Sequence, residues 1–271
     1  MTANERAPDT AAPDTAAPDG RSGHYAYVYG IVPADVTVTE TASGVGDPPA
    51  AVRLVRCGEV AALISDIQAG RPLGQPGDLV AHEQLLDAAA SQAPVLPFRF
   101  GAVLPGEQSV ADDLLDRWHD DFATQLAELD GRRQFVVQGR YAEMAVLREI
   151  LSESRPAAEL RDQIAGQPEA ATREARIRLG EIIATALEAK RDADTQAASE
   201  ALAPHSVAIA GRPPSHELQA VHLAVLVDPA GEQGFSDAIE ELTRHWAGRA
   251  ELRLVGPMAA YDFVTTSTAA G

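Results

Sequence analysis

The chain has little cysteine, few basic residues and no long apolar run. Its one cysteine, Cys57, excludes an intrachain disulfide and favours a cytoplasmic protein. No stretch approaches the ~20 consecutive apolar residues of a membrane-spanning helix, and the N-terminus lacks the apolar core of a signal peptide. The 40 acidic residues outnumber 22 basic ones, which gives a formal net charge of -18. We therefore expect no nucleic-acid partner and no membrane docking, because both need a basic surface.

The motifs of common catalytic and cofactor sites are also missing. There is no HExxH, P-loop, GxSxG or kinase set, and Gly44-Val45-Gly46 lacks the third glycine of a dinucleotide fingerprint. His216 and His222 would lie roughly 20 Å apart at ~3.3 Å per residue of strand, too far to share a metal. His82 falls on an apolar helix stripe, which favours a hydrogen-bonded core histidine over a catalytic base. We predict no catalytic, cofactor-binding or metal-ligating residue and no enzymatic activity.

The length of 271 residues is sufficient for two domains. Residues 1–22 repeat a Pro-, Ala- and Asp-rich theme without an aromatic residue, which indicates a disordered acidic tail. The rest divides near Gly131 into 23–130 and 131–271. Both parts mix strand and helix patterns, so the predicted fold class is α+β with two domains.

In the first part, strand patterns come before helix patterns. An aromatic and β-branched run predicts a strand over 25–32. Two further runs, 52–57 and 60–67, are separated by Gly58-Glu59 and predict a hairpin. Asp78 is placed as the N-cap of the next helix. The apolar stripe of that helix is Leu79, His82, Leu86 and Ala89.

The stretch Pro94–Gly101 is the densest apolar and aromatic run of the chain. Alternation places three of its side chains on one face of a strand: Leu96, Phe98 and Phe100. Val95 and Arg99 point to the other face. Pro97 removes one ladder donor, so we expect an edge strand or a bulge. A helix with a capping-box pattern from Ser109 follows, and it ends at Gly131.

The second part follows the element order of a known fold. From Arg132 the order is strand, helix, strand, strand, helix, strand, which is the ferredoxin-like βαββαβ order. Its first crossover is enlarged to a helical region over about 142–202, broken at Pro156 and at Gly166-Gln167-Pro168. The last predicted strand covers 250–255, and Gly256-Pro257 is expected to turn the chain after it.

Several of these stretches together resemble the GvpL/GvpF family of gas vesicle accessory proteins. The matching stretches, in collinear order over about 24–264, are Tyr27–Val32, Val60–Ile67, His82 with Pro94–Gly101, Arg140–Glu149, and Gly256-Pro257 with Tyr261–Val264. Met258-Ala259-Ala260 departs from the family pattern that follows the final Gly-Pro.

The resemblance implies a role in building gas vesicles, the gas-filled shells that give cells buoyancy. A member would be a non-enzymatic minor component or assembly factor without a cofactor, located at the gas vesicle in the cytoplasm. Its partners would be the apolar main shell protein and other gas vesicle accessory proteins. The family fold is two α+β domains, the second a modified ferredoxin fold. Our candidate partner-binding residues are Leu96, Phe98, Arg99, Phe100, Tyr261 and Phe263.

Two alternatives stay open. One is a small-molecule-binding enzyme on a ferredoxin-like fold, which would need His82, Arg99 and an acid in one deep pocket. The other is an adaptor or regulatory module that acts through the helical region 142–202.

Overall fold

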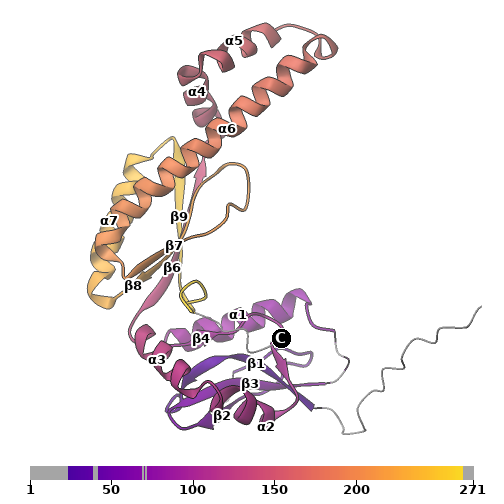
Figure 1. The fold of residues 1–271 in the computed structure, drawn as a ribbon, viewed down its shortest axis with the longest axis vertical. Helices are drawn as coiled ribbons and strands as arrows, with labels where there is room; N and C mark the ends of the chain where they lie inside the picture. The colour runs from indigo at the N-terminus through magenta and orange to yellow at the C-terminus, as the bar shows by residue number, and fades with distance from the viewer. Residues whose placement is uncertain (1–23, 39–41, 69, 71, 265–271) are drawn as a thin grey trace, which may run out of the picture.

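The computed structural model describes residues 24–38, 42–68, 70 and 72–264. The fold is mixed α+β with two sheets, each antiparallel throughout. The strands before residue 131 form one sheet and those after it form the other (Figure 1), and we call these halves the N-terminal part and the C-terminal part. The predicted tail, 1–22, lies outside the described residues. No helix of the described ranges has the length and apolar character to cross a membrane.

The sheet of the N-terminal part has the order β2-β3-β1-β4, and β5 also pairs with β1. Its strands are β1 (His24–Pro33), β2 (Val52–Cys57), β3 (Val60–Gln68), β4 (Leu96–Pro97) and β5 (Val103–Leu104). Cys57 lies opposite Val60, so Gly58 and Glu59 form the two-residue turn of the predicted hairpin. Gly58 has φ 55°, a left-handed conformation that favours glycine.

The first long helix, α1 (Pro76–Ala90), begins earlier than predicted. The prediction that Asp78 caps it was wrong, because Pro76 starts the helix with a φ already suited to the first turn. Asp78 lies inside that turn and is 3% exposed, whereas Leu79 is 45% exposed. The buried stripe of α1 is therefore Asp78, His82 and Leu86, at the four-residue spacing of one helix face.

The predicted helix from Ser109 to Gly131 is divided into three segments. They are α2 (Glu107–Ser109), the π-helical η1 (Val110–Asp116) and α3 (His119–Leu129). The side chain of Ser109 makes no cap, so the predicted capping box was wrong. The wider π turn buries Leu114 and Leu115 together, and Trp118 leaves helical geometry at φ -117° and ψ 18°.

The sheet of the C-terminal part has the order β7-β8-β6-β9. Its strands are β6 (Arg133–Tyr141), β7 (Ala208–Gly211), β8 (Gln219–Val227) and β9 (Ala250–Met258). The prediction that Gly256-Pro257 turns the chain was wrong, because β9 continues through both residues to Met258. The pairing of β9 with β6 instead shifts register between Gln134 and Val136.

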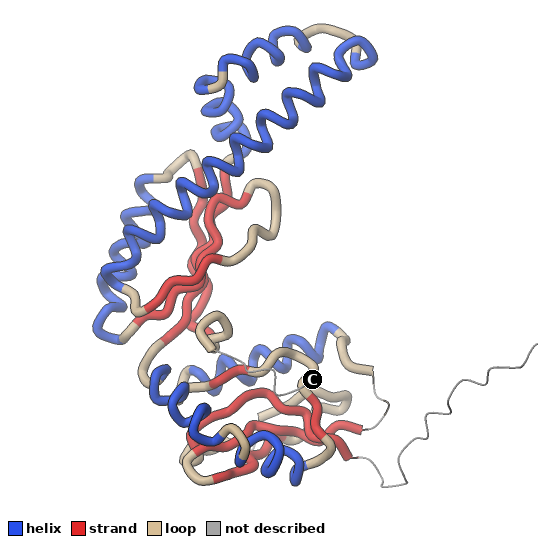
Figure 2. Tube along the Cα trace, viewed as in Figure 1, coloured by secondary structure: helices blue, strands red, loops and turns tan. Residues whose placement is uncertain are grey.

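Helices cover one face of this second sheet and extend beyond it. They are α4 (Glu143–Glu153), α5 (Arg155–Ile164), α6 (Glu169–Leu202) and α7 (Glu232–His245), with 3-10 turns η2 (Ala203–His205) and η3 (Pro229–Gly231). Figure 2 shows α6 and α7 along the sheet, while α4, α5 and the start of α6 project as an arm. The helical region is interrupted at Ser154 and at 165–168. The second break agrees with the predicted Gly166–Pro168, whereas Pro156 lies in the first turn of α5, two residues after the first break.

Hydrophobic clusters lie on both faces of the first sheet and between the second sheet and its helices. The segment Ala259–Val264 belongs to the chain end but packs into the N-terminal part. Ala259 and Tyr261 join the cluster around Tyr27, whereas Ala260 and Phe263 join the cluster on the other face. Figure 1 shows this segment as a yellow turn between the two sheets.

Candidate functional site

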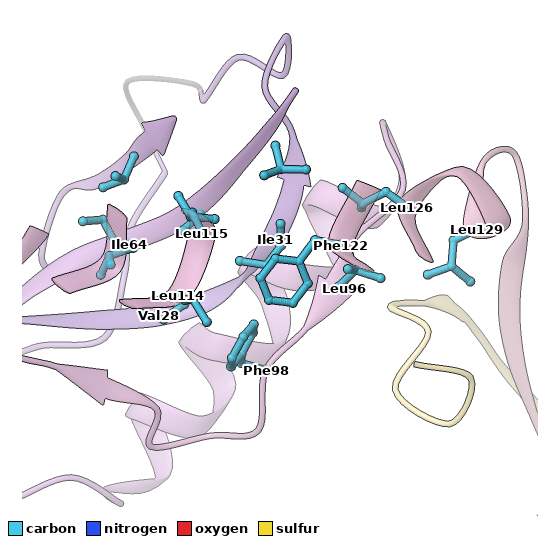
Figure 3. Close-up of a cluster of buried hydrophobic side chains, with 14 of the residues drawn as sticks. Val28, Ile31, Ile64, Leu96, Phe98, Leu114, Leu115, Phe122, Leu126 and Leu129 are labelled. Carbon is cyan, nitrogen blue, oxygen red and sulfur yellow. The ribbon is translucent and has the colours of Figure 1, made fainter. Parts of the chain in front are cut away.

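The stretch Pro94–Gly101 forms an edge of the first sheet, as predicted. Its strand β4 pairs with β1 through Ile31 opposite Leu96 and Gly30 opposite Pro97. Leu96 is 3% exposed and Phe98 is 8% exposed. Figure 3 shows both side chains directed into the cluster that contains Ile31 and Phe122. Leu96 and Phe98 thus support the edge from inside the core.

The alternation predicted for this stretch ends after Phe98. β4 is only two residues long, and the chain turns at Gly101, which has φ 98°. Phe100 therefore packs against the cluster on the opposite face from Leu96 and Phe98, so its predicted placement was wrong. Its ring centroid lies 6.0 Å from that of Tyr27 and 5.6 Å from that of His82. Arg99 is exposed and has no ion-pair partner among the described residues.

His82 links this stretch to α1 and β1 through two hydrogen bonds. Its Nε2 lies 3.2 Å from the Phe98 carbonyl oxygen, and its Nδ1 lies 2.9 Å from the Tyr27 hydroxyl. Because a carbonyl only accepts, Nε2 carries the proton and Nδ1 accepts from Tyr27. The Tyr27 oxygen in turn accepts from the Gly101 N–H at 3.1 Å. Burial lowers the pKa of His82 and raises that of Tyr27, so both stay neutral.

Tyr29 supplies a second buried polar link on the same face. Its hydroxyl lies 2.8 Å from the Ser65 hydroxyl and accepts from the Val45 N–H at 2.6 Å. Its ring stacks on His82 with centroids 5.7 Å apart. This network was not predicted from the sequence. The alternation of Tyr25, Tyr27 and Tyr29 along one strand was the available signal, since it places all three on one face.

These contacts confirm the prediction of a hydrogen-bonded core histidine. His82 is 1% exposed, whereas Arg99 is exposed. A cavity of about 340 Å³ does lie beside α1, lined by residues that include Val36, Val38, Leu63, Ala81, Leu85 and Ala88. Neither His82 nor Arg99 lines it. This cavity is therefore not the pocket that the enzyme alternative requires.

The C-terminal segment brings two more candidate residues to the same sheet. Tyr261 is half-buried against the cluster that holds Phe100, and Phe263 against the cluster that holds Leu96 and Phe98. Burial raises the pKa of Tyr261, with Asp87 adding to the shift. Five of the six predicted partner-binding residues thus pack on the two faces of one sheet, and the sixth, Arg99, is exposed after β4 ends.

Polar contacts hold this segment between the two parts. The Ala259 N–H donates to Asp87 Oδ1 at 3.1 Å. Asp262 accepts from Gln134 Nε2 at 2.6 Å and pairs with Arg212 at 3.2 Å. These bonds tie the chain end to α1 on one side and to the second sheet on the other.

The C-terminal part carries a charged network that was not predicted from the sequence. Arg249 pairs with Glu149 at 2.8 Å and with Asp194 at 2.9 Å. Lys190 pairs with Glu149 at 2.6 Å, and the Tyr141 hydroxyl donates to Asp194. Burial opposes ionisation of Glu149, but the hydrogen bonds from Arg249 and Lys190 lower its pKa. No group of three or more metal-ligating side chains occurs in the described ranges.

Comparison with known proteins gives consistent matches along the chain. Residues 25–265 match the family model described as gas vesicle synthesis protein GvpL/GvpF. Gas vesicle protein F of Streptomyces sp. (strain CB03234) is 32% identical over 246 residues, which cover 88% of this chain and 98% of that protein.

Two solved structures share the fold. The crystal structure of the gas vesicle protein GvpF from Anabaena sp. PCC7120 superposes with a TM-score of 0.73 at 24% identity, covering 91% of this chain and 100% of that one. The crystal structure of gas vesicle protein GvpF from Microcystis aeruginosa has a TM-score of 0.70 at 20% identity, with coverage of 88% and 98%.

Proposed function

This chain belongs to the GvpL/GvpF family of gas vesicle synthesis proteins, and from that premise we propose that it binds the apolar main shell protein while gas vesicles form. The observation that carries the proposal is the family match over residues 25–265. The role is that of a non-enzymatic assembly factor or minor component, at the gas vesicle in the cytoplasm. Other gas vesicle accessory proteins are further proposed partners.

The charge of the chain suits such a role. An apolar shell subunit aggregates in water unless its apolar surface is covered. A partner with a formal net charge of -18 resists non-specific association and keeps the complex dispersed. Binding then needs a local apolar or strand-edge surface on an otherwise acidic molecule.

We place the contact where β4 ends, beside the C-terminal segment. Arg99 is exposed there, and Phe100 and Tyr261 are half-buried against one cluster. Leu96 and Phe98 hold the edge from inside, and half-buried Phe263 packs against their cluster. The short strand and Pro97 limit how far a partner strand extends along this edge.

Light scattering with purified full-length chain and shell protein tests the function. We expect the chain to delay aggregation of the shell protein at comparable concentrations. An unchanged aggregation rate together with no complex in a pull-down would overturn the proposed function.

Two variants test the proposed surface. We expect Arg99→Glu with Phe100→Ser to weaken binding about tenfold, roughly 1.4 kcal/mol. Arg173→Glu is the matched control, because Arg173 is an exposed arginine on the arm. Wild-type binding by the folded double variant would remove this surface while leaving the function in place.

The same premise supports a finer description of the fold. We infer that the C-terminal part is a modified ferredoxin-like domain that begins at 131, after an N-terminal α+β domain over 23–130. The antiparallel order β7-β8-β6-β9 supports this inference, because strands two, three, one and four of a βαββαβ chain stand in that order. The arm, within 142–202, is then an insertion in its first crossover. Separate expression of 131–271 as a folded fragment is the test.

A further inference from the structure

The outer strands of the two sheets differ in how their edges are protected. In the first sheet, β4 and β5 are two residues each, and β4 contains Pro97, which lacks an N–H. The π-helical segment η1 packs against β2, the strand at the opposite edge, and against β3. In the second sheet, β7 has four residues. Strand β9 has nine residues, and its proline, Pro257, lies next to the last of them. β6 is its one strand partner in the described ranges.

The side chains of β9 leave complementary charges at this edge. Glu251 and Arg253 are exposed and share one face of the strand, opposite Arg140 and Gln138 of β6. Neither forms an ion pair with a described residue. On the other face, Leu254 is 39% exposed. Two opposite charges therefore lie two residues apart on one face of β9. They lie beside backbone N–H and C=O groups that have no strand partner among the described residues on the outer side.

We propose that β9 is a self-association surface through which two copies of this chain pair antiparallel about Leu252. In this register Glu251 of each copy lies opposite Arg253 of the other. Opposite charges at directly facing positions stabilise an antiparallel pair, and like charges destabilise it.

Neighbouring registers do not offer this match. Pairing about Glu251 sets Glu251 against its own copy, and pairing about Arg253 sets Arg253 against its own copy. A shift by one residue would join a side chain of one face to a side chain of the other, which a continuous pleated sheet does not allow. The alternation of charge along β9 thus selects one partner and one register.

The same arrangement buries apolar side chains on the other face of β9. Leu254 of one copy lies opposite Ala250 of the other, and the two Leu252 side chains face each other. The half-buried Leu252 and the exposed Leu254 then lose contact with water. The two sheets become one sheet that is closed at its longest free edge.

Sedimentation velocity of the full chain from about 1 µM to about 1 mM measures the dimer dissociation constant. Glu251→Arg places arginine against arginine twice, and Arg253→Glu places glutamate against glutamate twice. We expect each change to weaken the dimer about tenfold or more. The double variant Glu251→Arg with Arg253→Glu restores both opposite pairs, so its dissociation constant should return to the wild-type value.

These variants separate local pairing from net charge. Glu251→Arg makes the chain less negative, so relief of overall repulsion alone would strengthen association, whereas the proposed register weakens it. A chain that stays monomeric throughout the range would overturn the proposal. So would a dimer that tolerates both single reversals, or a double variant that stays as weak as the single ones.

Cross-linking gives an independent measure of the register. In a Cys57→Ser background, Leu252→Cys places two thiols at facing positions, within the ~4.4–6.8 Å Cα separation that a disulfide requires. Glu251→Cys is the matched control, because its two copies are offset along the strands beyond that separation. Efficient oxidation of the first variant and not of the second is expected. The reverse result would overturn the register.

Discussion

The two parts of the molecule differ in how they hold polar groups away from water. Beneath the first sheet, Tyr27, Tyr29 and His82 are almost fully buried and neutral, and they bond to one another or to backbone groups. In the C-terminal part, Glu149 and Arg249 are charged and keep 28% and 27% of their side-chain area exposed. Burying an ion completely costs several kcal/mol, so depth selects neutral groups and partial exposure permits charged ones.

Removal of His82 from the neutral network should cause the largest loss of stability among these changes. His82→Ala leaves a cavity and takes the partners of the Tyr27 hydroxyl and the Phe98 carbonyl, so we expect a loss of about 3 kcal/mol. Urea denaturation in a Trp246→Phe background measures this loss in the free energy of unfolding. Trp118 is then the one tryptophan that reports the transition, and it packs in the N-terminal part. The control is His216→Ala, because His216 is exposed. Its free energy of unfolding should stay within about 0.5 kcal/mol of wild type. Equal losses in both variants would contradict the network.

Removing Arg249 should break the charged network with a smaller effect. Arg249→Met leaves Glu149 and Asp194 without their shared cation, and partial exposure reduces the cost to about 2 kcal/mol. Trp246, buried in the C-terminal part, reports the transition in a Trp118→Phe background. Arg178→Met is the control, because its pair with Glu174 is exposed and should be worth less than about 0.5 kcal/mol. A loss no greater than that of the control would refute the prediction.

A pH series should separate the two networks. The pKa of His82 is lowered from 6.5, so the contribution of His82 to folding stability is complete above pH 6.5. This contribution falls at lower pH, because the unfolded state binds the proton before the folded state does. The slope is at most about 1.4 kcal/mol per pH unit. The pKa of Glu149 is lowered from 4.5, so its stabilisation persists to pH 4.5 and is lost below it.

The single-tryptophan backgrounds resolve this order. Between pH 6.5 and 4.5 the urea midpoint of the transition monitored by Trp118 should fall more than the midpoint monitored by Trp246. In His82→Ala the excess movement of Trp118 should disappear. Parallel shifts of both tryptophans in the wild type would show that the networks are not titrating separately.

Sequence patterns predicted the elements that local periodicity determines. The hairpin Val52–Gln68, the strand Arg133–Tyr141 and the helix breaks around 154 and 166–168 follow from alternation and from Gly and Pro. The short length of β4 could not be predicted from the sequence, because β5 pairs with β1 in its place beyond Gly101. The π-helical segment kept the spacing of an ordinary helix in the sequence, so its break at Trp118 was not visible there.

The candidate site was predictable in outline only. Pro94–Gly101 stood out by composition, and His82 by its place on an apolar stripe. The bond between His82 and Tyr27 joins residues 55 positions apart, and nothing local specifies it. The charged network likewise joins Glu149 to Arg249 across 100 positions. The arrangement of these groups depends on tertiary packing rather than on periodicity.

The return of Ala259–Val264 to the first sheet also sets a condition on synthesis. Ala259 is 0% exposed within a cluster whose other buried members, Tyr27 to Val95, are made much earlier. A ribosome adding ~5–20 residues per second releases Ala259–Val264 only after the strands of both sheets. The N-terminal part therefore lacks these side chains throughout the synthesis of the C-terminal part. The half of the protein that is made first completes its packing only when the end of the chain is available.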